Sequence, residues 1–406
     1  MQVDLPIGKT QWAVTVRAAD FAACAGPSTA PVADAEAAVF RAMDNPVKFE
    51  PLRRAMTPDD KVALVADEQL PELPKLIQGV LKYLAAAGIP PESVTVISPA
   101  GSAQDWIDGL GDEFADLHAE VHQPGDRKKL SYLATSKDGR RVYMNRTLVD
   151  ADQVIILSAR RHHPLLGLTG AAHLVYPALS DTENQKAART ALTTAALQGH
   201  APTDETASEV TMLLGLPLFV HVIEGPGEGL LEVSAGLPET VKECGERVDA
   251  LWHTTTPERA DTVLATLSGD PLRHTFDDLA RAAMAAARLV KPGGRVVVLS
   301  DADPDLGPGV TTLRQADHAV DAIKTLTKEK PADLTAALGW AMAATQAKLF
   351  LASEIRPDTV SEIFATPLPG PRELQALLDQ PGRVLHLPDA QLNWVTVPSA
   401  VGGSHP

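Results

Sequence analysis

Short β-branched segments alternate with helix-like segments along this chain, and this alternation constrains the fold more than any other feature. Residues 61–67 (KVALVAD) and 94–98 (VTVIS) are strand-like, and residues 74–87 between them carry apolar side chains at helical spacing. A strand, a helix and a second strand in this order predict parallel strands joined by a crossover helix. We therefore expect an α/β fold with mainly parallel sheets and with ligands at the carboxyl ends of the strands.

A second block of the same kind begins near residue 259. Residues 262–267 (TVLATL) and 295–300 (RVVVLS) are strand-like, and the Ala-rich segment 275–290 between them is helix-like. With a length of 406 residues, which suits two or three domains, the pattern predicts two α/β domains with a cleft between them. The expected parts are an N-terminal domain, residues 1–258, a C-terminal domain, 259–382, and a tail with one or two strands that returns to the first domain, 383–406.

Charge and cysteine content exclude several classes of protein. The chain has 36 Lys and Arg against 52 Asp and Glu, a net charge of −16 spread along its length, which disfavours binding to a nucleic-acid backbone. Cys24 and Cys244 are too few and too far apart for a disulfide framework or a cysteine zinc site. Because no apolar run is long enough to span a bilayer and no signal peptide is recognisable, we expect a cytoplasmic protein without nucleic-acid or membrane partners.

A Gly-rich stretch, residues 224–229 (EGPGEG), lies between two strand-like runs. A phosphate-binding loop should join a strand to a helix, whereas here a strand follows. Glu224 and Glu228 also place negative charge where a phosphate would lie. The stretch therefore predicts a β-hairpin.

The most informative polar cluster lies in segment 160–180 (RRHHPLLGLTGAAHLVYPALS), which follows the strand-like run 154–158 (VIILS). Its cationic and titratable residues are Arg160, Arg161, His162, His163 and His173. Its glycines allow the backbone to approach a ligand closely. Such a loop suits a carboxylate-binding or a metal-binding site, and the alternative is a surface loop with solvated histidines.

The order of these segments resembles that of the lactate racemase family, enzymes that interconvert the stereoisomers of 2-hydroxy acids with a nickel pincer nucleotide. The similar segments are residues 34–52, 60–74, 88–101, 163–180 and 268–309. In that family a histidine takes the hydroxyl proton while the cofactor takes the Cα hydride, so that a planar keto acid forms. The resemblance implies two histidines, one on each face of the substrate, within hydrogen-bond reach of the proton that they move.

Most reactive positions of the first domain are replaced in this chain. His163 matches one family histidine, but where the second belongs, the chain has residues 102–104 (SAQ). The lysine that carries the cofactor covalently corresponds to His173, whose imidazole cannot form the thioamide that a lysine amine forms. No histidine occurs in segment 174–199, where a metal ligand is expected, and the arginine that clamps the substrate carboxylate corresponds to Leu70.

The second domain keeps more of the family pattern. A family lysine corresponds to Arg281, which retains the charge but changes the geometry of the group. The polar pair before it corresponds to Asp277 and Asp278, and Trp340 matches the family tryptophan. The resemblance thus implies a kept scaffold around a changed site, on which racemisation by the family route is not expected.

The first hypothesis from these residues is a divergent member of the family that binds a small carboxylate between its domains. His163 is then the candidate catalytic residue, and the candidate substrate contacts are Arg160, Arg161, Arg281 and Trp340. On an acidic chain, such a pocket would be a local cationic exception suited to a small anion. If the chain is active, it would be an isomerase of hydroxy acids.

Two other hypotheses remain open. A metal-dependent enzyme could use His162, His163 and His173, because imidazoles suit zinc or nickel and three protein ligands leave an open position. A binding or regulatory paralogue without chemistry would explain the missing reactive groups. The placement of His163 relative to Arg281 bears most directly on the first hypothesis.

Overall fold

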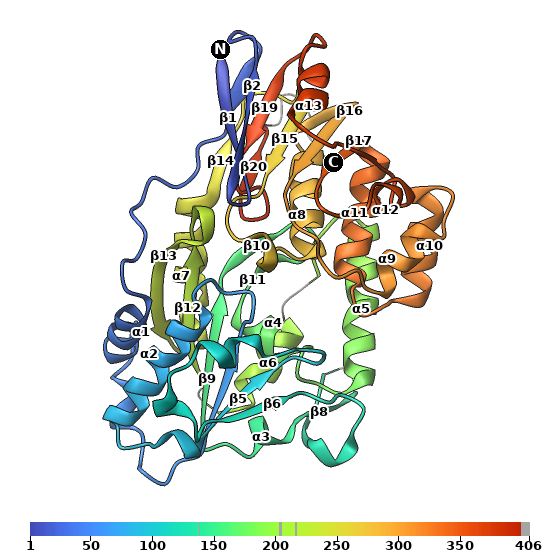
Figure 1. Ribbon diagram of the computed structural model, residues 1–406. Helices are drawn as coiled ribbons and strands as arrows, with labels where there is room; N and C mark the ends of the chain where they lie inside the picture. The colour runs from blue at the N-terminus through green and yellow to red at the C-terminus, as the bar shows by residue number, and fades with distance from the viewer. Residues whose placement is uncertain (138, 203–204, 216, 399–406) are drawn as a thin grey trace.

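The alternating apolar segments form two six-stranded sheets with helices packed on their faces, as the computed structural model shows (Figure 1). The structure describes residues 1–398 apart from residue 138, residues 203–204 and residue 216. The last eight residues of the predicted tail, 399–406, lie outside the described residues.

The first sheet has the strand order β13–β12–β9–β4–β5–β6, in which every neighbouring pair is parallel except the hairpin β12–β13. Its strands are β13 (Leu230–Gly236), β12 (Leu218–Glu224), β9 (Gln153–Ala159), β4 (Val62–Ala66), β5 (Val94–Ser98) and β6 (His118–Val121). The hairpin expected around residues 224–229 is confirmed by this antiparallel pair.

Helices cover both faces of this sheet because β4 is apolar throughout. Val62 and Leu64 pack on the side of α1 (Ala35–Asp44) and α2 (Leu73–Ala86). The alternate residues, Ala63 and Val65, point to the opposite face. The helices on that face are α4 (Ala171–Val175) and α6 (Glu205–Met212).

The second sheet is parallel throughout, with the order β18–β17–β16–β15–β19–β3. Its strands are β18 (Ala365–Pro367), β17 (Lys348–Ala352), β16 (Val290–Leu299), β15 (Ala260–Thr266), β19 (Val384–Leu387) and β3 (Phe21–Ala23). One face packs on α8 (Phe276–Ala287) and α11 (Leu334–Gln346). The other packs on the hairpin β1 (Gln2–Ile7)–β2 (Thr10–Thr15) and on α13 (Pro371–Leu378).

The two ends of the chain meet in the second sheet. The structure places β19 of the tail between β15 and β3, and β3 lies in the predicted N-terminal part, residues 1–258. Beyond it, β20 (Trp394–Thr396) pairs with β14 (His253–Thr255). Parallel hydrogen bonding to β15 and to β3 thus ties the tail and the N-terminal residues to the second sheet.

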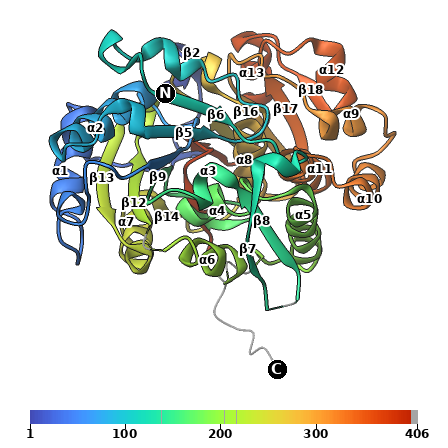
Figure 2. The same ribbon diagram turned by 90° about the horizontal axis from the view of Figure 1, so that it is seen from below.

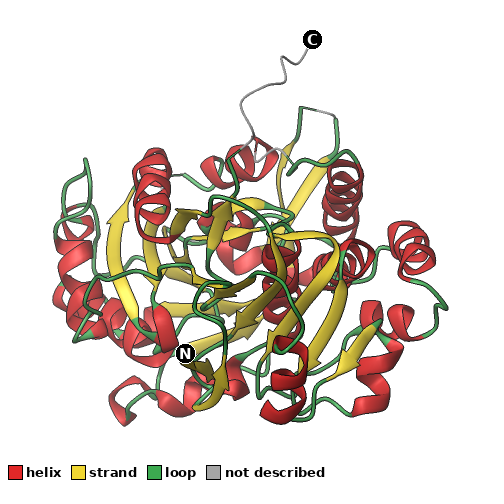
Figure 3. Ribbon diagram, turned by 90° about the horizontal axis from the view of Figure 1, so that it is seen from above, coloured by secondary structure: helices red, strands yellow, loops and turns green. Residues whose placement is uncertain are grey.

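The other elements lie around these two sheets. The remaining helices are α3 (Arg146–Val149), α5 (Thr182–Leu197), α7 (Val241–Trp252), α9 (Pro308–Arg314), α10 (Ala319–Glu329) and α12 (Pro357–Glu362). The remaining strands are β7 (Leu130–Thr135), β8 (Arg141–Asn145), β10 (Arg161–His163) and β11 (Gly167–Thr169). Figure 2 shows α1 and α2 on one side of the molecule and α9–α12 on the other, and Figure 3 shows most helices outside the strands. Among the described residues, no helix combines the length and the apolar character needed to cross a bilayer.

Candidate functional site

A cleft lies between the two sheets, where strands of both sheets end. From the first-sheet side, Gln69, Arg161, Glu224 and Glu228 line it. From the second-sheet side and the tail, it is lined by Ser268, Arg273, His274, Asp278, Arg281 and Gln391. Because β4, β9, β12 and β15 all end next to these residues, the cleft follows the rule that ligand sites lie at the carboxyl ends of parallel strands.

Arg161 enters the cleft from β10 between two carboxylates. Its Nη2 lies 3.0 Å from Oδ2 of Asp67, just after β4, and its Nε lies 2.9 Å from Oε2 of Glu224, the last residue of β12. Burial alone would lower the pKa of Arg161, but Glu224 and Asp67 outweigh burial and raise this pKa above its usual value. The guanidinium is therefore a permanent cation of the cleft wall.

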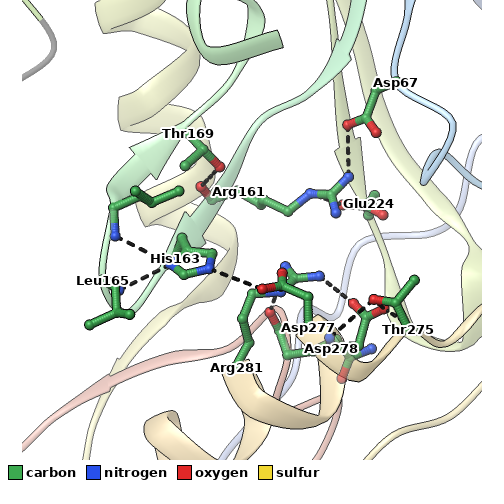
Figure 4. Close-up of polar contacts among 12 residues, drawn as sticks. Asp67, Arg161, His163, Leu165, Thr169, Glu224, Thr275, Asp277, Asp278 and Arg281 are labelled. Atoms are coloured by element: carbon green, nitrogen blue, oxygen red, sulfur yellow. Dashed lines mark hydrogen bonds and ion pairs between the residues drawn. The ribbon is translucent and has the colours of Figure 1, made fainter. Parts of the chain in front are cut away.

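Arg281 enters the cleft from α8, opposite Arg161 (Figure 4). Its Nη1 donates to the carbonyl oxygen of Gln391 at 3.2 Å, and its Nε lies 3.3 Å from Oδ2 of Asp277. Its Nη2 donates to Asp278. Asp277 and Asp278 reach the arginine because residues three and four apart share one side of a helix. Burial raises the pKa of the Asp277 carboxyl, but His163 and Arg281 outweigh it and lower that pKa to about 2.

His163 lies on β10 and shares Asp277 with Arg281. Its Nδ1 accepts hydrogen bonds from the backbone N–H groups of Leu165 at 3.0 Å and Leu166 at 3.2 Å. Its Nε2 lies 3.7 Å from Oδ1 of Asp277, and burial lowers the pKa of the imidazole. The structure thus brings His163, Arg161 and Arg281 to one region, as the first hypothesis requires.

Arg160 and His162 point away from this region, although both were candidate ligands. Arg160 donates to the carbonyl oxygen of Leu168 at 3.4 Å, and His162 lies 2.7 Å from Oδ1 of Asp249, with its ring stacked on Trp394. The physical reason is the two-residue period of an extended chain, which sends alternate side chains to opposite faces. The sequence of segment 160–180 indicates a loop, in which this alternation is not expected, whereas residues 161–163 form the strand β10.

The predicted three-histidine metal site is not assembled. His162 and His163 diverge, and His173 lies on the separate short helix α4. Within the part of the chain that the structure describes, no group of three or more His, Cys, Asp or Glu side chains is placed to hold a metal ion.

Trp340 was a candidate substrate contact, but the structure places it in the core of the second-sheet half. Its side chain is 0% exposed, and its ring packs against Phe276 at a centroid distance of 5.4 Å. Its Nε1 donates to the carbonyl oxygen of Ile363 at 2.7 Å. Because this side chain projects from α11 and is completely enclosed against α8, it does not line the cleft.

The expected cationic pocket is charge-balanced instead. Three arginines line the cleft, Arg161, Arg273 and Arg281, and three carboxylates line it with them, Glu224, Glu228 and Asp278. Sequence reasoning missed Arg273 and did not assign Asp67 a role. The signal for Asp67 was its position directly after a buried strand, whereas nothing in the sequence singles out Arg273.

Contacts between the two halves form the wall of the cleft near Arg273. Its Nη2 donates to the carbonyl oxygen of Gln69 at 2.8 Å, and its Nη1 lies 3.5 Å from Oε1 of Glu228. Close by, the backbone N–H of Gly227 donates to Oγ of Ser268 at 3.0 Å, and this hydroxyl in turn donates to Asp389. The hairpin β12–β13 is thereby joined to the second-sheet half.

Buried polar atoms without a hydrogen-bond partner gather at this cleft. Within the described residues, such atoms include Oε2 of Glu224, Nδ1 of His274, Nε of Arg281 and Oε1 of Gln391, all on residues that line it. Two of these side chains also contact an opposite charge, but without hydrogen-bond geometry. Because native proteins rarely leave buried polar atoms unpaired, the cleft is suited to a molecule or water that offers both donors and acceptors.

The positions matched to the family's reactive residues hold side chains of other chemistry. Leu70 is 1% exposed and packs in the apolar core of the first-sheet half, and Oγ of Ser102 donates to Oε1 of Glu68 at 2.6 Å. By the resemblance, His173 stands where the family has its attachment lysine. Because an imidazole cannot form the thioamide that a lysine amine forms, this side chain does not fit a covalently attached nickel pincer nucleotide.

Comparisons with known proteins agree with the order of segments. Residues 7–196 match the family model described as the lactate racemase N-terminal domain. The lactate racemase apoprotein from Thermoanaerobacterium thermosaccharolyticum superposes with a TM-score of 0.79 at 17% identity, covering 98% of this chain and 100% of that chain. A protein from Thermotoga maritima superposes with a TM-score of 0.67 at 11% identity, covering 89% of this chain and 98% of that one. A search of curated proteins found no match.

Proposed function

Because residues 7–196 match the lactate racemase N-terminal domain and the whole chain has the fold of a lactate racemase apoprotein, we propose that it binds a small hydroxycarboxylate in the cleft between its two sheets. We further propose that it does not racemise this ligand by the nickel-dependent route of the family. The observation that carries the proposal is the set of buried polar atoms on the cleft lining that have no hydrogen-bond partner, although those of Glu224 and Arg281 each contact an opposite charge.

The charges of the lining support a ligand that is both anionic and hydroxylated. Arg161, Arg273 and Arg281 offer guanidinium forks that match a carboxylate. Glu224 and Gln391 offer acceptor oxygens, which suit the hydrogen of a ligand hydroxyl. A purely anionic ligand would leave these acceptors unsatisfied, whereas a hydroxycarboxylate satisfies both kinds of group.

The absence of racemisation is proposed from the chemistry of the replaced positions. The side chains of Leu70 and Ser102 offer neither a carboxylate clamp nor a proton acceptor that titrates near neutrality. Removing a single proton-transfer group commonly lowers a rate by about 10²- to 10⁴-fold, and in this chain the attachment lysine is replaced as well.

Calorimetric titration of the wild-type chain with D-lactate, L-lactate, malate and pyruvate tests the proposal. Arg273 is the arginine of the lining to vary, because its side chain is 32% exposed and its loss leaves no deeply buried carboxylate. We expect Arg273→Gln to weaken binding by about tenfold, since a hydrogen bond to a charged group contributes roughly 1.5–3 kcal/mol. The same samples incubated with L-lactate are expected to yield no D-lactate.

Arg314→Gln is the matched control, because Arg314 pairs with Glu362 at a similar exposure but outside the cleft lining. Its affinity should equal that of the wild type. The binding proposal is wrong if the wild type binds none of the four compounds at millimolar concentration, or if Arg273→Gln and Arg314→Gln weaken binding equally. Either result favours the hypothesis of a paralogue that acts through another partner.

A further inference from the structure

His163 is the one residue whose match to a family histidine would make it a proton acceptor, and its hydrogen bonds argue otherwise. A neutral imidazole has one nitrogen that donates and one that accepts. Nδ1 of His163 receives two backbone N–H donors, from Leu165 at 3.0 Å and Leu166 at 3.2 Å. Its lone pair is therefore occupied, and the ring proton must lie on Nε2.

The two backbone donors also oppose the addition of a second proton. A proton on Nδ1 would face the N–H groups of Leu165 and Leu166, which sit at fixed positions in the turn between β10 and β11. The imidazole is 6% exposed, so little water is available to replace those lost contacts. Neither nitrogen is thus able to take a proton from a ligand without breaking this arrangement.

The Nε2–H group points across the cleft wall to the other half of the molecule (Figure 4). It faces Oδ1 of Asp277 at 3.7 Å, which is beyond hydrogen-bond distance, so the contact is an electrostatic attraction between the N–H and the carboxylate. The second oxygen of that carboxylate lies 3.3 Å from Nε of Arg281. His163 itself does not line the cleft, whereas Arg281 does. The influence of His163 on a ligand therefore runs through Asp277 and Arg281.

We propose that His163 is a positioning residue, held as the Nε2–H tautomer, that orients Asp277 and through it Arg281 across the interface between the two halves. It is not the proton acceptor that its place in the family pattern implies. The ligand-binding part of this inference rests on the function proposed above, whereas the tautomer does not.

Nuclear magnetic resonance of the chain labelled with ¹⁵N-histidine tests the tautomer without any ligand. The imidazole signals of His163, identified by their loss in His163→Gln, are expected to show a protonated Nε2 and an unprotonated Nδ1 at neutral pH. Signals of the Nδ1–H tautomer, of an exchanging mixture or of an imidazolium would overturn the inference.

The positioning role is tested by replacing His163 with glutamine or asparagine and measuring which variant keeps its affinity for pyruvate. The terminal amide of glutamine reaches the place of Nε2, whereas that of asparagine reaches only the place of Nδ1. We expect His163→Gln to bind pyruvate within about threefold of wild type, and His163→Asn and His163→Leu to bind about fivefold or more weakly, because both lose the N–H that faces Asp277.

Equal loss in the glutamine and asparagine variants, with both folded by circular dichroism, would contradict the positioning role. If the wild type does not bind pyruvate or any of the hydroxy acids, the proposed function fails. The ¹⁵N spectrum then still decides whether His163 is fixed as a donor, so the two failures are distinguishable.

Discussion

Replacing Arg281 with methionine is expected to lower the free energy of unfolding by about 3–5 kcal/mol, the usual cost of breaking a buried ion pair from one side. The arginine is 4% exposed and lies between Asp277 and Asp278 at the start of α8. Methionine keeps much of the apolar stem but leaves two neighbouring carboxylates without their cation. Urea unfolding of both proteins measures the difference.

The stability of the wild type is expected to depend on pH by the same reasoning. The folded-state pKa of Asp277 is about 2, below the ordinary value of 3.8, so the ionised carboxyl stabilises the folded chain above pH 3.8. That contribution is lost as the pH falls through about 2. Arg281→Met removes one of the three groups that lower this pKa, His163, Arg281 and Arg161, so its destabilisation should be largest at neutral pH.

Arg314→Met is the control for this substitution, because the pair Arg314–Glu362 is partly exposed at 37% and 42%. Exposed pairs contribute about 0–1 kcal/mol, so the control should unfold close to the wild type. Removal of one partner of a buried ion pair is expected to cost about 3–5 kcal/mol. A loss of unfolding free energy below about 1 kcal/mol in Arg281→Met would therefore show that this pair is not structurally important.

Replacing Trp340 with alanine is also expected to cost about 3–5 kcal/mol, the range for large-to-small substitutions of buried aromatic residues. The indole is fully enclosed, packs on Phe276 and donates to the carbonyl oxygen of Ile363. Alanine leaves a cavity in the core between α8 and α11 and an unpaired carbonyl group. Thermal and urea unfolding measure the loss.

Trp340→Phe separates a core role from a ligand role. It keeps an aromatic ring in the core and removes the N–H donor and part of the indole volume, so the expected cost falls to about 1–3 kcal/mol. Affinity for hydroxy acids should remain at the wild-type value in this variant, because Trp340 does not line the cleft. Lost affinity with unchanged stability would place the tryptophan at the ligand instead.

The sequence predicted the fold class because strand and helix periods are local properties. Residues 61–67, for example, form β4 (Val62–Ala66), and the apolar side chains of that strand fill both faces as a buried parallel strand requires. The tail was harder to predict. Pairing of β19 with β3 joins residues more than 360 positions apart, and no local pattern encodes a partner at that distance.

The site was predicted in part. The pattern after strand 154–158 located Arg161 and His163, and the family resemblance added Arg281. Their carboxylate partners were not deduced, because Asp67 is 94 positions from Arg161 and meets it only through the order of β4 and β9 in the sheet. The match of Trp340 to a family tryptophan also does not predict where its side chain points, since packing decides whether it faces the cleft or the core.

A crystal structure of the chain with the tightest-binding hydroxy acid tests the central claim most directly. We expect the ligand in the cleft, with its carboxylate within hydrogen-bond distance of Arg161, Arg273 or Arg281 and its hydroxyl at Glu224 or Gln391. A ligand bound elsewhere, or a cleft without ligand at saturating concentration, would contradict the claim that this cleft is a hydroxycarboxylate site.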